Sequence, residues 1–502
     1  MSIESFAMLA DENKRRAIRS AMGRRNFFGQ VGTGMYGAAL ASLMGRDLFG
    51  NTPEGAAKPG SPRPIYNVAP RKPQFEPKAK AVIHLFMNGG PSQMDLLDPK
   101  PVLDRMHGQS YFEKIAGEVE SPGSGGALMR TPFKFAQHGK SGMWVSNAMP
   151  HFAECVDDVA MIRSMHTVNL THEPALYQIH SGRTLPGQPS LGSWVTYGLG
   201  SESENLPAYV VLDDPLGLPV NGTQSWASGF LPPVYQGTRF KATGTPVLNL
   251  ERQYDEPDEI TQVERNLIGS LDRLHRARRD GQTQLDARIA SYELAAKMQM
   301  TAPEALDLSQ ETAATLAMYG IGDKTTDSYG RRCLIARRLV ERGVRFVQLF
   351  INSQIWDNHD HLQPELQKAC DRTDKPVAAL LKDLKARGLF DSVLVLWGGE
   401  FGRLPIAQLR GGDEAVTSGR DHNKNAFSCW LAGAGIKAGT IHGSTDEIGL
   451  MAVENRVSVT DWHATILHLL GLNYEDVFYE RNGLNEKLTG VEQANIVKAI
   501  LA

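Results

Sequence analysis

Short apolar runs recur along the chain, and each of the clearest ones is followed by glycine and polar residues. The runs cover residues 81–86, 159–165, 207–212, 344–351, 392–397 and 426–431. Runs of this length without polar alternation are typical of strands buried on both faces of a parallel sheet. Residues 331–342 and 376–387 are predicted as helices that end at Gly343 and Gly388. The alternation predicts an α/β fold, a three-layer sandwich around a mostly parallel sheet.

Residues 251–300 show a different pattern, dense in charge with leucines at helical spacing. Leu267, Leu271 and Leu274 form one set, and Asp280 and Gly281 mark a turn before a second set. We expect a helical hairpin inserted in the α/β domain. The expected layout is a signal region 1–45, a proline-rich linker 46–80, the α/β domain 81–475 and a C-terminal extension 476–502.

Composition narrows the function classes. The 502 residues are 41% hydrophobic and 22% charged, with a net charge of -3, which is ordinary for a globular enzyme. No basic stripe with interleaved aromatics is present, which argues against nucleic-acid binding. None of the four cysteines lies in a Cys-x-x-Cys pair, which argues against a structural zinc ribbon. The oligomeric state stays open.

The N-terminus resembles a twin-arginine export signal. Arg24 and Arg25 precede Phe27 and Phe28, and a mild apolar run covers residues 31–43. This run is too short for a normal membrane span, so we expect an exported periplasmic or cell-envelope protein without a transmembrane span. The alternative is an amphipathic N-terminal helix of a cytoplasmic protein.

Candidate metal ligands cluster where predicted strands end. Asp357, His359 and His361 follow the run 344–351, and Glu400 follows the run 392–397. Carboxylate and imidazole groups on one loop suit Zn, Mn or Fe. In open α/β sheets, sites form beyond the carboxyl ends of the strands. The alternative is a polar surface loop whose histidines bind nothing.

Four further candidate residues lie elsewhere. Asp95 follows the strand 81–86 after two glycines, and His422 lies in a loop flanked by glycine and arginine. Thr171 and His172 precede Pro174, at the start of a predicted helix. Free N–H groups at a helix N-terminus favour an anion. His422 as a surface histidine and Glu400 as an ion-pair partner are the structural alternatives.

With these residues in place, the chain resembles the alkaline phosphatase/sulfatase superfamily. Residues 172–183 are similar to the sulfatase helix that begins with the nucleophile, with Gly182 and Arg183 matching its end and His172 at the nucleophile position. Residues 357–361 resemble the superfamily's Asp-x-x-x-His metal motif, and His422 resembles its late metal histidine.

The closer resemblance is to domain-of-unknown-function family 1501, a bacterial, often exported branch of that superfamily. It is carried by residues 89–100, 172–183, 356–359 and 398–403. The absence of Cys or Ser at the nucleophile position excludes formylglycine chemistry there. Phe401 lies where the superfamily has a histidine that binds a second metal ion. Asn88 and Gly89 lie where it has two acidic residues after the first strand. Both differences argue against a full two-metal site.

The leading hypothesis is a metal-dependent hydrolase that acts on a phosphate or sulfate ester, small or polysaccharide, through a metal-activated water. The metal would be Zn, Mn, Fe or Ca. The expected metal ligands are Asp357, His359, His361, His422, Glu400 and Asp95. The expected catalytic residues are His172 as anion contact or general acid, Arg183 in support, Glu400, and Thr171 as a weaker candidate nucleophile. The alternative is a catalytically inactive, metal-containing protein that binds anionic polysaccharide.

Overall fold

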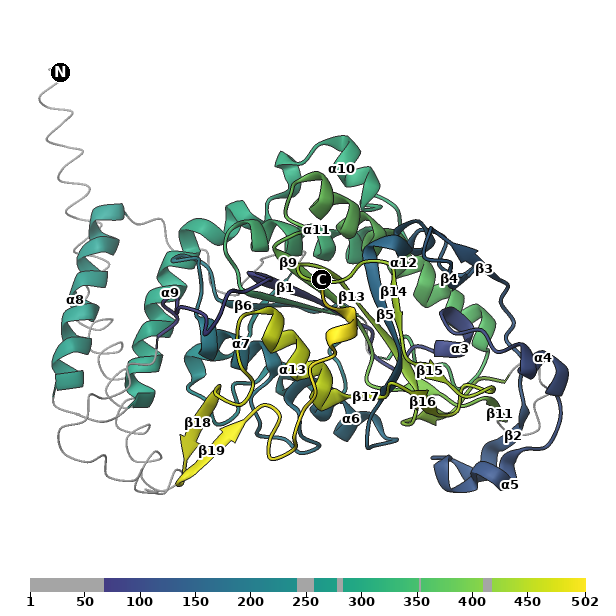
Figure 1. Ribbon diagram of the computed structural model, residues 1–502. Helices are drawn as coiled ribbons and strands as arrows, with labels where there is room; N and C mark the ends of the chain where they lie inside the picture. Colours follow the sequence, from purple (N-terminus) through teal and green to yellow (C-terminus); the bar gives the residue numbers. More distant parts are fainter. Residues whose placement is uncertain (1–66, 242–256, 278–282, 352–353, 410–417) are drawn as a thin grey trace, which may run out of the picture. The chain divides into compact units, whose positions relative to one another are not determined.

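The structure, a computed structural model, describes residues 67–241, 257–277, 283–351, 354–409 and 418–502 (Figure 1). The chain divides into two units, Met1–Arg63 and Pro64–Ala502. The first unit, with the predicted signal region, lies outside the described residues. The second unit holds the sheet and all the candidate site residues.

A nine-stranded sheet forms the centre of the second unit, in the order β14-β5-β13-β9-β1-β8-β6-β7 with β17 paired to β5. The strands are β1 (Ala81–Phe86), β5 (Val159–His166), β6 (Tyr209–Leu212), β7 (Thr238–Phe240), β8 (Phe346–Phe350), β9 (Val393–Gly398), β13 (Phe427–Gly433), β14 (Thr440–His442) and β17 (Val457–Ser458). Among the described strands of this sheet, β13 alone runs antiparallel to its neighbours. The predicted mostly parallel sheet is confirmed.

Helices cover both faces of the sheet. Successive strand residues point to opposite sides, and here both sides carry apolar side chains that the helices bury. In β1, Ile83 and Leu85 join the core beneath α11 (Asp327–Glu341) and α12 (Leu362–Ala386). Val82 and Phe86 join the core on the other face, which α6 (His172–Ser181), α7 (Leu191–Leu199) and α13 (Val459–Leu469) cover. Figure 1 shows α11 and α12 above the sheet and the other three helices below it. The mixed α/β class is therefore confirmed, with the sheet between two helical layers.

Several element boundaries differ from the sequence prediction. The helix predicted over 376–387 begins at Leu362 and contains Pro376 in its interior. Its buried positions Leu362, Leu366, Cys370 and Val377 keep helical spacing across the proline, so packing of this stripe outweighs the one backbone hydrogen bond that a proline removes. Residues 215–241, for which the sequence predicts no element, contain two 3₁₀ turns and the edge strand β7.

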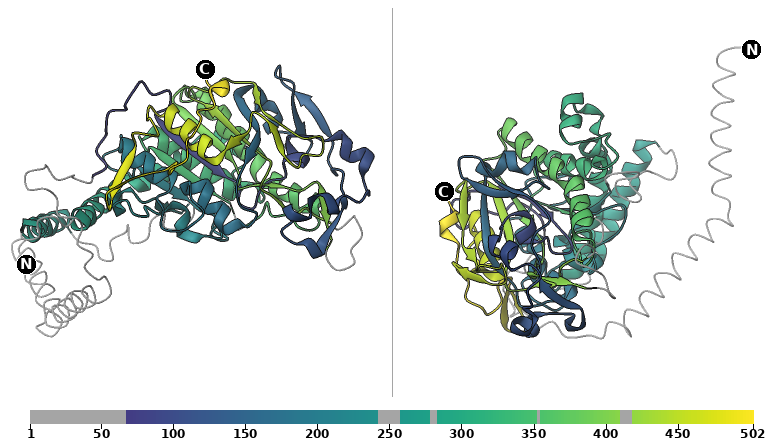
Figure 2. Two further views of the ribbon diagram at one scale, coloured as in Figure 1. Left: turned by 60° about the horizontal axis from the view of Figure 1, so that its bottom comes forward. Right: turned by 90° about the vertical axis from the view of Figure 1, so that its right-hand side faces the viewer.

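The predicted helical insertion consists of α8 (Asp258–Ala277) and α9 (Thr283–Leu306). Met298, Ala302 and Ala305 fix the second half of α9 to the core beneath α11. Figure 1 and the left view of Figure 2 show α8 projecting away from the sheet. The turn expected at Asp280 and Gly281 lies outside the described residues.

The two flanking segments also contact the α/β body. The backbone N–H of Lys78 donates to Leu469 O at 2.9 Å, and the N–H of Arg71 donates to Leu199 O at 2.8 Å. At the other end, the hairpin of β18 (Phe478–Arg481) and β19 (Leu484–Lys487) precedes Ile500, which is fully buried in the core. Of the helices in the described parts of the chain, none has the length and apolar character needed to cross a membrane.

Candidate metal centre

The site lies where three neighbouring strands end. β9, β1 and β8 are adjacent and parallel, so the loops that follow them meet at one edge of the sheet. The loop after β8 carries Asp357 and His359, and the chain after β9 carries Glu400. The predicted meeting of these loops therefore follows directly from the strand order.

Two further histidines reach this edge from other elements. His172 is the first residue of α6, which follows β5. His422 begins the short strand β12 (His422–Asn423), which pairs antiparallel with β10 (Gly402–Arg403). Because β10 comes four residues after β9, this pairing holds His422 beside the loops of the central strands.

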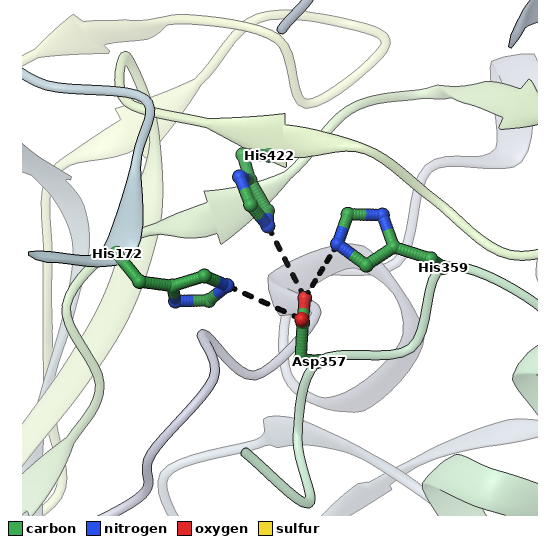
Figure 3. Close-up of side chains that lie close together, drawn as sticks. All are labelled: His172, Asp357, His359 and His422. Atoms are coloured by element: carbon green, nitrogen blue, oxygen red, sulfur yellow. Dashed lines mark hydrogen bonds and ion pairs between the residues drawn. The ribbon is translucent and has the colours of Figure 1, made fainter. Parts of the chain in front are cut away.

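The imidazoles of His172, His359 and His422 converge on the carboxylate of Asp357 (Figure 3). Asp357 Oδ1 lies 2.8 Å from His359 Nε2 and 3.1 Å from His422 Nε2. Asp357 Oδ2 lies 3.3 Å from His172 Nε2. Ligand atoms of these four side chains all lie within 4.8 Å of one another. Residues from three distant parts of the sequence thus share one small volume.

The second ring nitrogen of each histidine is also engaged. Each Nδ1 faces a side-chain oxygen, and the pairs are His172 with Glu400, His359 with Gln408 and His422 with Glu120. An acceptor at Nδ1 holds the proton there and leaves the Nε2 lone pair free to bind a cation. All three Nε2 atoms are therefore set up as electron-pair donors on the Asp357 side.

Glu400 is fully buried, with 0% exposure. Its Oε1 lies 2.7 Å from His172 Nδ1, and the backbone N–H of Gly89 donates to both carboxylate oxygens, at 3.0 and 3.2 Å. Gly89 has φ +111°, and a Cβ there would lie 2.5 Å from the backbone nitrogen of Asp357. The glycine after β1 thus allows both the close approach of the Asp357 loop and the anchoring of Glu400.

Arg403 holds the Asp357 loop in place. Its Nη2 donates to Asp357 Oδ1 at 2.6 Å, and its other donors reach the carbonyl oxygens of Gly90 and Arg420 at 2.9 and 3.1 Å. Burial would raise the pKa of Asp357, but the charge of Arg403 and the three histidines outweigh burial and hold it far below its usual range. Asp357 is therefore a permanent carboxylate, as a metal ligand must be.

The carboxylates of Asp357 and Glu400 change the pKa of His172. Burial lowers its pKa, but hydrogen bonds with Asp357 and Glu400 outweigh burial and raise it to about 9. Without a cation the ring is thus protonated at neutral pH. A metal ion beside Asp357 would have to displace this proton.

Phe401 fills the space next to the histidines. It is fully buried, and its ring centroid lies 4.8 Å from that of His172 and 4.4 Å from that of His422. This aromatic packing occupies the position that the resemblance gives to a second metal ligand. A phenylalanine offers no ligand atom, so this position adds none to the four-residue group.

Three other predicted residues have side chains that face other partners. Asp95 is fully buried and forms a two-point ion pair with Arg420, with N···O distances of 2.7 and 3.2 Å. His361 is half exposed and lies 3.5 Å from Asp360. The Thr171 hydroxyl is exposed and donates to the Asn169 side chain at 2.9 Å. None of these three contacts involves the Asp357 carboxylate.

Arg183 also lies away from the histidines. It follows the C-terminal end of α6, whose ten residues span about 15 Å from His172. Its guanidinium lies against Gly490, close to the C-terminal segment. It therefore does not support His172 directly.

Sequence reasoning missed Glu120 and Gln408. Glu120 lies in a loop remote from the predicted strands, and its pKa is lowered by the bond to His422. Asp421 completes a second group with Glu120 and His422, but its oxygens already accept from the backbone N–H groups of Ser121 and His422, at 2.9 and 2.8 Å. No local motif marks these residues, so only their tertiary contacts reveal them.

The four-residue group fits a divalent metal ion. His172 Nε2 is buried, and its polar neighbour among the described residues is Asp357 Oδ2 at 3.3 Å. Two ligands about 2.0–2.1 Å from one tetrahedral ion lie roughly 3.3 Å apart, and the observed separations from the Asp357 oxygens are 2.8, 3.1 and 3.3 Å. Three imidazole nitrogens and one carboxylate oxygen also form a donor set that transition metals prefer.

Solved structures of similar architecture are distant in sequence. The lipoteichoic acid synthase LtaP from Listeria monocytogenes matches with 8% identity, a TM-score of 0.35 and coverage of 79% of this chain and 73% of that chain. The PsFucS1 sulfatase from Pseudoalteromonas sp. matches with 13% identity, a TM-score of 0.34 and coverage of 80% and 68%. TAB5 alkaline phosphatase matches with 12% identity, a TM-score of 0.36 and coverage of 79% and 99%. Scores of this size carry no activity over to this chain.

No curated protein matches the sequence. The model of one protein family, described as "Protein of unknown function (DUF1501)", matches residues 79–501. This range includes the whole nine-stranded sheet and all four residues of the metal-ligand group. The chain belongs to the DUF1501 family.

Proposed function

We propose that His172, Asp357, His359 and His422 hold one divalent metal ion, and that the protein is a metal-dependent hydrolase of a phosphate or sulfate ester. The observation that carries the proposal is the double arrangement of the histidines. Three Nε2 atoms face one carboxylate, while each Nδ1 is engaged by an acceptor. Metal-binding histidines in proteins are oriented in this way.

The donor set favours Zn, Mn or Fe over Ca, because calcium takes oxygen ligands and this group offers three nitrogens. In this proposal His172 binds the metal ion. Its sequence position had indicated contact with the substrate instead. Glu400 likewise acts through His172, because its oxygens are already engaged by His172 and the Gly89 N–H. Both residues therefore help to hold the ion.

A bound divalent ion supplies two things: it lowers the pKa of a coordinated water, and it stabilises negative charge on an ester oxygen. The chain's own residues hold the ligand side chains in place and exclude water from part of the site. Phe401 excludes water from the face of His172 and His422, and Arg403 fixes the Asp357 carboxylate. Thr171 is exposed and bonded to Asn169, so water is a better nucleophile here than the Thr171 hydroxyl.

The substrate class is supported by a cavity of about 360 Å³ beside Asp357. Its lining includes Lys368 and Arg372 together with the carboxylates of Asp360 and Glu365. A guanidinium binds a tetrahedral oxyanion through two parallel hydrogen bonds. Arg372 is mostly buried, with one nitrogen 3.3 Å from Asp214, so it is held in the cavity wall in a restricted orientation.

Turnover of aryl phosphate and aryl sulfate esters tests this function in protein loaded with Zn, Mn or Fe. The Asp357→Asn variant should lose turnover, whereas His361→Ala, a change in the same loop at a half-exposed residue, should keep it. No turnover by the metal-loaded protein, combined with metal-dependent binding of a sulfated polysaccharide, would instead support an inactive binding protein.

We also propose that the protein is exported through the twin-arginine pathway. The support is the sequence alone, because Arg24 and Arg25 lie outside the described residues. The Arg24→Lys/Arg25→Lys variant should remain in the cytoplasm while the native sequence reaches the periplasm. Equal periplasmic amounts of the two proteins in cell fractions would contradict export by this route.

A further inference from the structure

Helix α8 carries an apolar stripe that faces solvent. Ile260, Val263, Leu267, Leu271 and Leu274 recur at intervals of three and four residues, so they line one face over about 21 Å. Their exposed fractions are 46, 66, 59, 55 and 59%. Ile268, 57% exposed, lies beside the stripe. A narrow apolar stripe of this kind is typical of a helix that pairs with another helix.

None of the hydrophobic clusters in the described parts of the chain covers this stripe. The described hydrophobic clusters include residues of α9 but none of α8. In Figure 1 and the left view of Figure 2, α8 projects away from the sheet beside α9. Monomeric proteins rarely expose contiguous apolar patches of several large side chains without a partner.

The charges of α8 argue against a membrane as that partner. The helix contains four acidic residues, three arginines and no lysine. Helices that lie on anionic membranes carry an excess of lysine and arginine on the polar face. The mixed charges of α8 are instead typical of a helix that pairs with another helix.

The charges beside the stripe select one orientation. Glu259 and Arg273 lie fourteen residues apart on the same edge of the stripe, and Glu264 lies on the opposite edge. Both glutamates and Arg273 belong to exposed positions. If two copies of α8 pair in parallel, Glu259 of one copy meets Glu264 of the other. If they pair antiparallel, Glu259 of each copy meets Arg273 of the other.

We propose that α8 pairs antiparallel with α8 of a second copy of this chain, forming a two-fold symmetric dimer. In such an interface each contact occurs twice, so the Glu259–Arg273 pair forms at both ends of the seam. The apolar stripe supplies the stability of the dimer and the charges set its direction. The interface lies on the inserted hairpin, so the metal centre of each copy stays independent of it.

Light scattering and sedimentation of the full-length protein test the proposal. The native protein should be a dimer, and Leu267→Asp/Leu274→Asp should be a monomer with the same far-ultraviolet circular dichroism spectrum as the native protein. Leu185→Asp is the matched control, because Leu185 is an equally exposed leucine away from α8 (69%), and this variant should remain dimeric.

A charge exchange tests the orientation. Glu259→Arg should weaken the dimer about tenfold, because two opposite-charge pairs become two like-charge pairs. Adding Arg273→Glu in the same chain should restore the native dissociation constant. A monomeric native protein at high concentration, or a dimer unaffected by Leu267→Asp/Leu274→Asp, would overturn the proposal. Binding of a monomeric protein to anionic vesicles through α8 would do the same.

Discussion

Replacing Glu400 with Gln isolates the role of the buried carboxylate behind His172. Glu400 Oε1 accepts from His172 Nδ1 at 2.7 Å and from the Gly89 N–H at 3.0 Å, and Oε2 lies 3.2 Å from the same N–H. A glutamine oxygen can take only one of these positions. If it takes the Oε1 position, the amide nitrogen faces the Gly89 N–H, donor against donor.

The opposite placement is also unfavourable for metal binding. With the amide nitrogen next to His172, Nδ1 has to accept a hydrogen bond, so the ring proton moves to Nε2, which then cannot bind a cation. An unsatisfied buried donor costs about 1–3 kcal/mol. Loss of the carboxylate that accepts a hydrogen bond from a metal-binding histidine lowers metal affinity about 10–100-fold. This loss is equivalent to roughly 1.4–2.7 kcal/mol.

A competition titration against a chromogenic zinc chelator measures this change. Glu173→Gln is the matched control, because it makes the same chemical change at the neighbouring exposed residue of α6 and should leave the affinity unchanged. A Glu400→Gln protein that folds normally and binds zinc within about twofold of the native affinity would refute the role given to Glu400.

Two further predictions concern the substrate cavity and the buried histidines. Arg372→Lys should raise KM about tenfold for an anionic ester and change kcat little, because a lysine cannot form the two-point contact; unchanged KM would remove Arg372 from substrate binding. Burial lowers the pKa of His84 to about 3, of His463 to about 4, and of His180 well below its usual value. The unfolded chain therefore binds more protons than the folded one between about pH 6.5 and 4, so stability falls with falling pH. The melting temperature of metal-free protein should be lower near pH 5.5 than near pH 7, and equal values would contradict this burial effect.

The parts of the site that follow from local sequence were predictable. Asp357 and His359 come shortly after a fully apolar run, and the order of β9, β1 and β8 brings Glu400 to the same edge. The predicted α/β class rested on the same runs. Local pattern is sufficient here because strand burial and strand direction together determine where a following loop lies.

The remaining contacts depend on tertiary packing. Glu120 reaches His422 from a distant part of the sequence, and no spacing rule links them. Asp95 resembles a ligand in sequence, but in the fold it pairs with Arg420, which lies two residues before His422. Its carboxylate thus positions the strand that carries a histidine, a role that only the three-dimensional neighbours of Arg420 reveal.

Metal analysis of the purified protein tests the central claim most directly. The native protein and His361→Ala should each contain about one Zn, Mn or Fe ion per chain, because His361 lies outside the group of four. His359→Ala should lose that ion while keeping its fold. A native protein that contains no metal after expression in metal-supplemented medium would contradict the account, because the histidines around Asp357 would then form only an ion-pair cluster.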